Sequence, residues 1–200
     1  MAKIKLCGLS RPEDIAVANE IMPEYIGFVF AAKSRRYLDP EKARALKKAL
    51  DGNIKAVGVF VRENPEQVAY LLSEGIIDVA QLHGGEDEEY VGKLRSLTDK
   101  PLIQAFRIDT ADDVKKAVKS GADYILLDSG DGGTGTSFDW SLIKDIDRPY
   151  FLAGGLDSEK IKTALEMPGL YGLDVSSGIE TDGLKDPVKM REFARSARNE

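Results

Sequence analysis

Two side chains in this sequence have the chemistry of a proton donor and a proton acceptor, and each ends a short apolar run. Cys7 closes the run at residues 4–7, and Asp128 closes the run at 124–128. A thiol near a cation can act as a base or nucleophile, and a carboxyl at the end of a buried strand can transfer a proton. Each also has a plainer interpretation. A lone cysteine is usually a small buried hydrophobe, and an Asp before Ser-Gly-Asp-Gly-Gly can simply form a turn.

Glycine-rich turns follow the last three apolar runs and could bind an anion. Their candidate binding residues are Gly133, Gly154, Gly155, Ser177 and Gly178. Glycine lets backbone amides approach an anion closely, although a single glycine pair also occurs in ordinary tight turns. Two such turns after the last two strands of a barrel favour a phosphate site. None matches the phosphate loop of nucleotide hydrolases or the dinucleotide fingerprint, so we expect neither ATP nor NAD.

Three further polar residues are candidates with weaker support. Arg36, in the basic run 33–36, could hold a carboxylate through two parallel hydrogen bonds, but composition alone favours a solvated surface arginine. Gln81 lies in the run at 79–82, and His83 directly follows the end of that run. A single histidine there is more often a hydrogen-bonded structural group than a ligand.

The elements that must position these residues alternate along the chain. Apolar, β-branched runs predict strands at 4–7, 25–30, 56–61, 79–82, 102–106, 124–128, 150–153 and 172–176. Helical periodicity predicts helices at 12–21, 40–50, 65–73, 86–97, 111–119, 140–144, 159–166 and 187–197. Eight units of this kind predict an α/β fold, a single (β/α)8 TIM barrel over residues 1–200. If one strand were missing, an open sheet would result instead.

Local signals place the helix starts and the direction of the side chains. Asp39, Asn64 and Asp186 each stand just before a Pro that opens a helix, and Ser10 stands two residues before Pro12. All four are predicted to cap these helices. Strand alternation points Lys5 and Cys7 into the barrel, with Asp174 inward on the adjacent last strand. We expect an ion pair between Lys5 and Asp174 beneath Cys7, whose positive charge would favour the thiolate. In the alternative, Lys5 reaches away to the bottom of the barrel and Asp174 caps a turn.

Composition limits the partners. The chain has 200 residues, a net charge of −6 and one cysteine. Without a basic stripe it is a poor candidate for nucleic acid, and without an apolar segment long enough to span a bilayer we expect no membrane partner. A lone cysteine and no apolar leader predict a cytoplasmic location. The sparse Cys and His argue against a zinc site. The absence of a conspicuous apolar surface stripe favours a monomer, and a homodimer is left open.

Several motifs resemble one family in order and spacing. They are Lys5-Leu6-Cys7-Gly8, Lys33-Ser34-Arg35-Arg36-Tyr37, Gln81-Leu82-His83-Gly84, Leu127-Asp128, Gly133-Thr134-Gly135, Ala153-Gly154-Gly155 and Asp174-Val175-Ser176-Ser177-Gly178-Ile179-Glu180. Each motif is weak alone, but the ordered set resembles phosphoribosylanthranilate isomerase over nearly the whole chain.

The resemblance implies an Amadori rearrangement of a phosphosugar, N-(5-phosphoribosyl)anthranilate, in tryptophan biosynthesis, without metal or cofactor. It implies a general base at Cys7, a general acid at Asp128 and a carboxylate-binding residue at Arg36. Backbone amides in the turns at Gly154-Gly155 and Ser177-Gly178 would hold the phosphate.

Two other interpretations of the sequence compete with this one. A ribulose-phosphate epimerase would, by resemblance, use His and Asp around a metal, and one histidine argues against it. A binding barrel that kept the phosphate turns and lost the chemistry would not need both Cys7 and Asp128.

Overall fold

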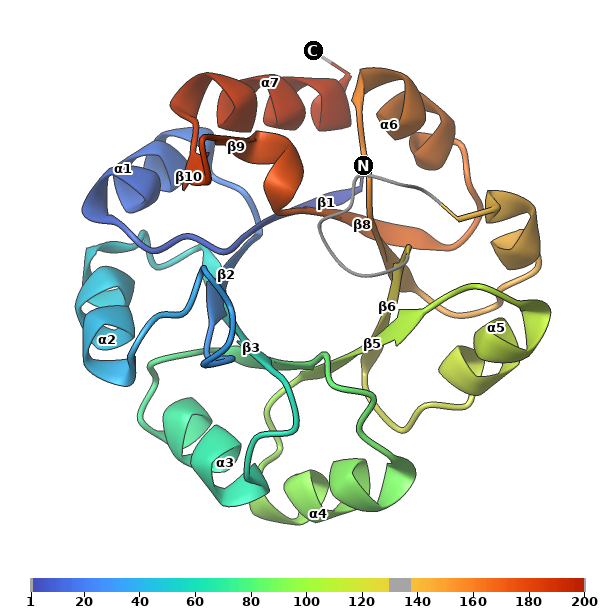
Figure 1. Ribbon diagram of the computed structural model, residues 1–200, viewed down its shortest axis with the longest axis horizontal. Helices are drawn as coiled ribbons and strands as arrows, with labels where there is room; N and C mark the ends of the chain where they lie inside the picture. The colour runs from blue at the N-terminus through green and yellow to red at the C-terminus, as the bar shows by residue number, and fades with distance from the viewer. Residues whose placement is uncertain (1, 130–137, 200) are drawn as a thin grey trace.

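The computed structural model describes residues 2–129 and 138–199, in which eight parallel strands close into a barrel. Each strand pairs with the next, and β8 pairs with β1. Figure 1 looks along the barrel axis, with the helices arranged as a ring outside the strands. The strands are β1 (Lys3–Cys7), β2 (Tyr25–Val29), β3 (Lys55–Phe60), β4 (Val79–Leu82), β5 (Leu102–Arg107), β6 (Tyr124–Asp128), β7 (Tyr150–Ala153) and β8 (Leu170–Val175). The closed sheet confirms the predicted barrel and rules out the open sheet.

The helices follow the predicted order, with one difference in kind. They are α1 (Pro12–Ile21), α2 (Pro40–Ala49), α3 (Pro65–Ser73), α4 (Glu88–Leu97), α5 (Ala111–Val118), α6 (Ser158–Leu165) and α7 (Pro187–Arg198). The helix predicted at 140–144 is instead a single 3-10 turn, η1 (Trp140–Ile143). The Asp139 side chain caps this turn by accepting from the backbone N–H of Ser141 at 2.9 Å. None of the described helices is long and apolar enough to cross a membrane.

Helix capping agrees with the sequence at three of the four predicted sites. Asp39, Asn64 and Asp186 each accept a hydrogen bond from a backbone N–H of the first turn. The prediction for Ser10 is wrong, because the N-cap residue of α1 is Arg11. The buried carboxylate of Asp14 closes this end from inside the helix, accepting from the backbone N–H groups of Ser10 and Arg11 at 2.9 and 3.0 Å.

The core has a layer outside the barrel and a smaller one within it. Outward-facing strand residues such as Ile4, Leu6 and Ile26 pack under the helices in the larger cluster. The barrel interior holds a second cluster: Val57, Val79, Ile103, Ala105, Leu126, Phe151 and Ala153, with Tyr25, Tyr124 and Tyr171 packed against it. The tyrosines close the amino end of the barrel, where the Tyr25 and Tyr171 hydroxyls lie 2.8 Å apart. The carboxyl end is left for polar groups.

A small hairpin that the sequence analysis did not anticipate lies between β8 and α7. A short 3-10 turn, η2 (Ser177–Ile179), leads into β9 (Glu180–Thr181), which pairs antiparallel with β10 (Leu184–Lys185). In Figure 1 the hairpin lies next to α1 and α7, over one side of the barrel. Its two ends, Glu180 and Lys185, are buried charged residues. The hairpin places Glu180 and Lys185 at the rim of the barrel.

Candidate active site

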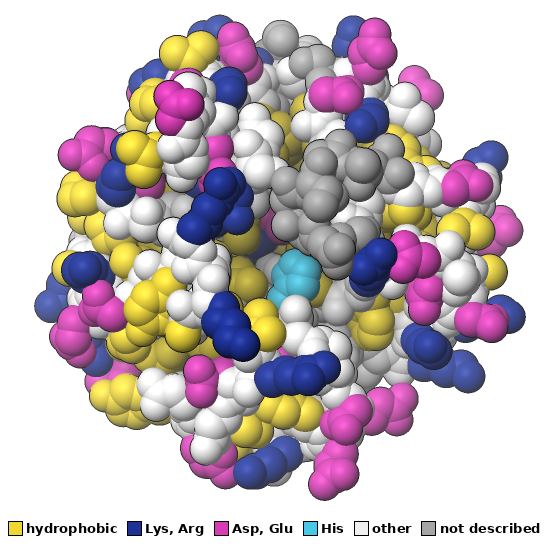
Figure 2. All heavy atoms as spheres, in the orientation of Figure 1, with side chains coloured by type: hydrophobic (Ala, Val, Ile, Leu, Met, Phe, Trp, Pro, Cys, Tyr) yellow, Lys and Arg dark blue, Asp and Glu magenta, His cyan; other side chains and the backbone are white. Residues whose placement is uncertain are grey.

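A cavity of about 330 Å³ opens at the carboxyl ends of the strands. Figure 2 shows a hollow at the centre of this face, with the histidine at its edge and Lys and Arg side chains around it. The predicted residues that line it are Cys7, Arg36, Gln81, His83, Asp128, Gly154, Gly155, Asp174, Ser177 and Gly178. Lys5 lies beneath the cavity and is fully buried. Gly133 lies outside the described residues.

Cys7 lies at the mouth of the barrel, above an interior ion pair. Its side chain packs with Val29 and Val59. Gly27 on the neighbouring strand allows this position, because a Cβ on Gly27 would lie 2.6 Å from Cys7 Sγ. Cys7 is therefore held by β1, β2 and β3 at a fixed place in the cavity.

The predicted pair of Lys5 and Asp174 is present. The two residues are register partners across β1 and β8, and Lys5 Nζ donates to Asp174 Oδ1 at 2.8 Å. Burial works against the charge on Lys5, but the charges and hydrogen bonds of Asp174 and Cys7 together outweigh burial and raise the pKa of Lys5. The ammonium is therefore a permanent positive charge below Cys7.

This charge does not make the Cys7 thiolate the favoured form. Burial and the Asp174 carboxylate together raise the pKa of the Cys7 thiol by more than Lys5 and Lys185 lower it. Lys5 therefore acts in the predicted direction, but the sequence analysis underestimated desolvation of the thiol.

Asp128 closes β6 on the same cavity and is nearly buried, with 7% of its surface exposed. Its Oδ1 accepts from the backbone N–H of Ser129 at 2.8 Å, and its Oδ2 lies 3.6 Å from His83 Nε2. The amide nitrogen of Gln81 lies 3.0 Å from His83 Nδ1. His83 therefore lies between Gln81 and Asp128, with one ring nitrogen facing each of them.

The two glycine-bearing turns present backbone amides to the cavity. Gly154 and Gly155 have φ values of +89° and +57°, a left-handed backbone that favours glycine. Within the described residues, the backbone N–H groups of Gly154, Gly155, Ser177 and Gly178 donate to no protein acceptor. Amides that converge on a cavity in this way can bind an anion.

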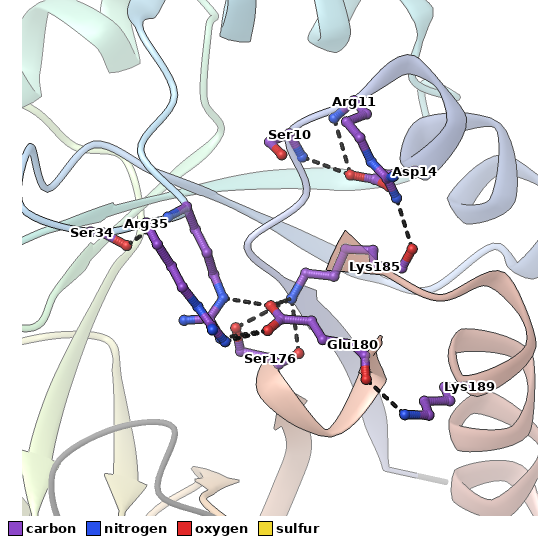
Figure 3. A network of polar contacts seen from close by, with 10 residues as sticks. Ser10, Arg11, Asp14, Ser34, Arg35, Ser176, Glu180, Lys185 and Lys189 are labelled. Carbon is purple, nitrogen blue, oxygen red and sulfur yellow. Dashed lines mark hydrogen bonds and ion pairs between the residues drawn. The ribbon is translucent and has the colours of Figure 1, made fainter. Parts of the chain in front are cut away.

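Arg36 enters the cavity from the loop after β2, and Glu180 holds it. Its Nε and Nη2 donate to Glu180 Oε1 and Oε2 at 2.6 and 2.9 Å. Arg35 Nη2 donates to the same carboxylate at 2.6 Å, and Lys185 Nζ does so at 2.7 Å. Figure 3 shows Glu180 at the centre of this network, between the arginine loop and the β9–β10 hairpin. The Arg36 side chain is only 17% exposed, so the solvated-surface interpretation is wrong.

Metal-binding chemistry is poorly provided for here. Across residues 2–129 and 138–199, no group of three or more His, Cys, Asp or Glu side chains is placed to hold a metal ion.

Comparisons with known proteins agree with this geometry. The family model described as "N-(5'phosphoribosyl)anthranilate (PRA) isomerase" matches residues 4–196. A relative named N-(5'-phosphoribosyl)anthranilate isomerase, from Endomicrobium trichonymphae, is 41% identical, with all of both chains covered. The chain belongs to the phosphoribosylanthranilate isomerase family. It is thus an isomerase of tryptophan biosynthesis.

Solved phosphoribosylanthranilate isomerases share the whole fold. Monomers generated from the dimeric enzyme of Thermotoga maritima superpose with a TM-score of 0.87 at 34% identity, with 100% of both chains covered. Another, in complex with reduced 1-(o-carboxyphenylamino)-1-deoxyribulose 5-phosphate, gives a TM-score of 0.87 at 33% identity, again with 100% of both chains covered. The family therefore includes a structure that binds a carboxyphenylamino sugar phosphate.

Two buried charged residues, Glu180 and Lys185, have roles at this site that the sequence alone did not predict. Glu180 stands at the end of a quoted motif, but nothing in its local sequence shows that three cations converge on it. Lys185 follows Leu184 in what reads as an ordinary turn. The one available signal was the basic run at 33–36. The acidic residues that follow it, Asp39 and Glu41, belong to the start of the next predicted helix, so the run requires a distant counter-charge if it is buried.

Proposed function

We propose that this cavity converts N-(5-phosphoribosyl)anthranilate to 1-(2-carboxyphenylamino)-1-deoxyribulose 5-phosphate, with Asp128 as the acid and Cys7 as the base. The observation that carries the proposal is that a carboxyl and a thiol, held on separate strands, line one cavity together with unpaired backbone amides. An acid and a base on different strands can serve different atoms of one substrate.

The first step opens the ribose ring. Asp128 donates a proton to the ring oxygen as the bond from that oxygen to C1′ breaks. The lone pair of the anthranilate nitrogen forms a double bond to C1′, which gives a cationic iminium. His83 and Gln81 support this step, because the ring of His83, contacted at Nδ1 by Gln81, lies beside the Asp128 carboxyl with Nε2 3.6 Å from Oδ2.

The second step moves a proton from carbon. Cys7, as thiolate, removes the C2′ proton, and the released electron pair forms the C1′=C2′ bond and neutralises the iminium nitrogen. The enolamine then gains a proton at C1′ and loses the hydroxyl proton at C2′, which leaves the ketone. The iminium is itself a positive charge beside the thiol, so it opposes the effect of burial and favours the thiolate when the base is needed. Lys5, paired with Asp174, adds to this effect.

The ends of the substrate fit two further sets of groups. The amides of Gly154, Gly155, Ser177 and Gly178 would hold the phosphate, and Arg36 would hold the anthranilate carboxylate. Gly133 would add to the phosphate turns, as its place in the motif suggests. The carboxyphenylamino sugar phosphate bound by a solved relative has the same two charged ends.

We further propose a cytoplasmic monomer. A reducing compartment preserves the free thiol of Cys7. Several large exposed apolar residues, among them Met22, Tyr70, Leu97 and Val188, lie on or beside different helices rather than on one face. Sedimentation at micromolar concentration tests this, and a dimer mass would overturn the monomer.

The proposed roles are tested by Cys7→Ala and Asp128→Asn. General acid–base groups typically contribute ~10²–10⁴-fold, so we expect kcat to fall in that range for each variant. Circular dichroism should report an unchanged fold, since both side chains lie at the cavity surface. A variant that retains more than about a tenth of the wild-type kcat would remove that residue from its role.

A further inference from the structure

Glu180 is a buried carboxylate at the rim of the cavity that the acid–base chemistry does not use. Its side chain is 5% exposed and contacts Arg35, Arg36 and Lys185. Burial disfavours its charge, but the hydrogen bonds and charges of Arg36 and Lys185 together lower the pKa of Glu180 to about 2. Glu180 is therefore ionised throughout the neutral range, and its charge holds a fixed arrangement of cations.

The geometry leaves one edge of the Arg36 guanidinium available. A guanidinium has two forked edges, one formed by Nε and Nη2 and one by Nη1 and Nη2. Glu180 occupies the first edge with both of its oxygens. Within the described residues, Nη1 donates to no protein acceptor, and Arg36 lines the cavity. A planar group held at two points along one edge cannot rotate, so the other edge keeps a constant direction.

Lys185 fixes Glu180 in turn. Its ammonium donates to Glu180 Oε1 at 2.7 Å and to the carbonyl of Ser176 at 2.8 Å. Ser176 directly precedes the Ser177–Gly178 turn of the proposed phosphate site. Glu180 is thereby tied to the backbone that leads into this turn, so the carboxylate-binding and phosphate-binding ends of the cavity have a common support (Figure 3).

Charge at this rim remains positive despite Glu180. Arg35, Arg36 and Lys185 carry three positive charges against one negative charge. An approaching carboxylate therefore meets a net attraction, although Arg36 already has a carboxylate partner.

We propose that Glu180 is a positioning residue for substrate specificity. It holds Arg36 so that the Nη1–Nη2 edge is presented to the cavity, which selects substrates that carry a carboxylate on the aromatic ring. This inference rests on the proposed function, in which Arg36 binds that carboxylate.

The test compares two substrates in Glu180→Gln. A glutamine has one acceptor oxygen in place of two and no negative charge, so it cannot form the two parallel charge-assisted hydrogen bonds that Glu180 accepts from Nε and Nη2. For N-(5-phosphoribosyl)anthranilate we expect KM to rise about tenfold, the effect of a weakened charge-assisted contact, with kcat within about twofold of wild type. For N-(5-phosphoribosyl)aniline, which lacks the carboxylate, we expect KM to stay unchanged. In an Arg36→Met background, Glu180→Gln should add no further rise for the first substrate.

Glu20→Gln is the matched control. Glu20 holds Arg191 through both oxygens, at 2.9 and 2.6 Å, in the outer layer of helices away from the cavity. This variant should leave KM for both substrates unchanged. Glu180→Asp, which keeps the charge but shortens the reach, serves if the glutamine variant does not fold, and should raise KM for the carboxylated substrate alone.

The possible outcomes separate the two proposals. An equal rise in KM for both substrates would show a general structural role and overturn the inference. An unchanged KM in Glu180→Gln together with a raised KM in Arg36→Met would overturn the inference and leave the proposed function standing. An unchanged KM in Arg36→Met would remove the carboxylate site itself, and the role of Glu180 with it.

Discussion

The ionisation of Cys7 shows how opposing effects meet at a single atom. Burial raises the pKa of its thiol, whereas Lys5 below it and Lys185 at the rim lower that pKa. A thiol with a high pKa is a strong base but is rarely ionised, and a thiol with a low pKa is ionised but weakly basic. The two cations around this desolvated sulfur therefore limit the rise in pKa that burial causes.

The variant Lys5→Met tests this balance. It removes a positive charge and leaves Asp174 unpaired, and both changes raise the pKa of Cys7. Alkylation of Cys7 near neutral pH should therefore slow, because the thiolate population falls about tenfold for each unit by which the pKa rises.

Lys3→Met serves as the control for this measurement. Lys3 pairs with Glu24 at the amino end of β1, and its side chain is 43% exposed. Its removal should leave the alkylation rate unchanged. An unchanged rate in Lys5→Met itself would make the interior pair purely structural.

At the scale of the elements, periodicity and capping predicted most of the fold. Strand alternation placed Lys5 and Asp174 on the inner face, and their register pairing follows from the closure of β8 on β1. The predicted Ser10 cap was wrong, because the buried Asp14 carboxylate closes that end of α1. The helix predicted at 140–144 is present only as a 3-10 turn. The β9–β10 hairpin was not predicted, since its two short strands carry no periodic signal.

The residues of the site could likewise be predicted only where they belong to a regular element. Residues at strand ends, such as Cys7 and Asp128, are predictable because the topology brings all carboxyl ends of the strands together. The contact between Arg36 and Glu180 joins residues 144 positions apart through an irregular segment. No local pattern predicts this contact, because neither Arg36 nor Glu180 belongs to a stretch with helical or strand periodicity.

The turn after β7 provides a prediction about an element. A Cβ at Gly154, where φ is +89°, would lie 2.0 Å from Ser129 Oγ and 2.8 Å from Asp128 Oδ1. Gly154→Ala must therefore displace the Asp128 carboxyl as well as strain the backbone. We expect kcat to fall at least tenfold and stability to fall by about 1–3 kcal/mol.

Gly75→Ala is the matched comparison. Its φ is +66°, but its Cβ would meet nothing within 4 Å. It should lose about 1–2 kcal/mol of stability from the left-handed backbone alone, with kcat unchanged. Equal kcat values for the two variants would show that Asp128 tolerates the displacement.

At the scale of the whole molecule, charge is distributed unevenly. The chain has a net charge of −6, yet cations surround the opening of the barrel, as Figure 2 shows. An anionic substrate is thereby drawn to one face of an otherwise acidic protein. The cations at this face require a buried counter-charge, and Glu180 supplies it from a hairpin placed after the last barrel strand. Folding of that hairpin and formation of the substrate site are therefore linked.

This linkage predicts how acid affects stability. The pKa of Glu180 is lowered to about 2 in the folded protein, below the ordinary glutamate value of 4.5. A carboxyl with a lowered folded pKa stabilises the fold above its unfolded pKa, and that contribution is lost as pH falls toward the folded pKa. The free energy of unfolding of wild type should exceed that of Glu180→Gln by on the order of 3 kcal/mol at pH 7. The difference should shrink between about pH 5 and pH 2.

Urea unfolding at several pH values measures this difference in the free energy of unfolding. Glu20→Gln, which alters an exposed pair, should show a much smaller difference from wild type. A difference between wild type and Glu180→Gln that stays constant from pH 7 to pH 3 would mean that the charge of Glu180 does not stabilise the barrel.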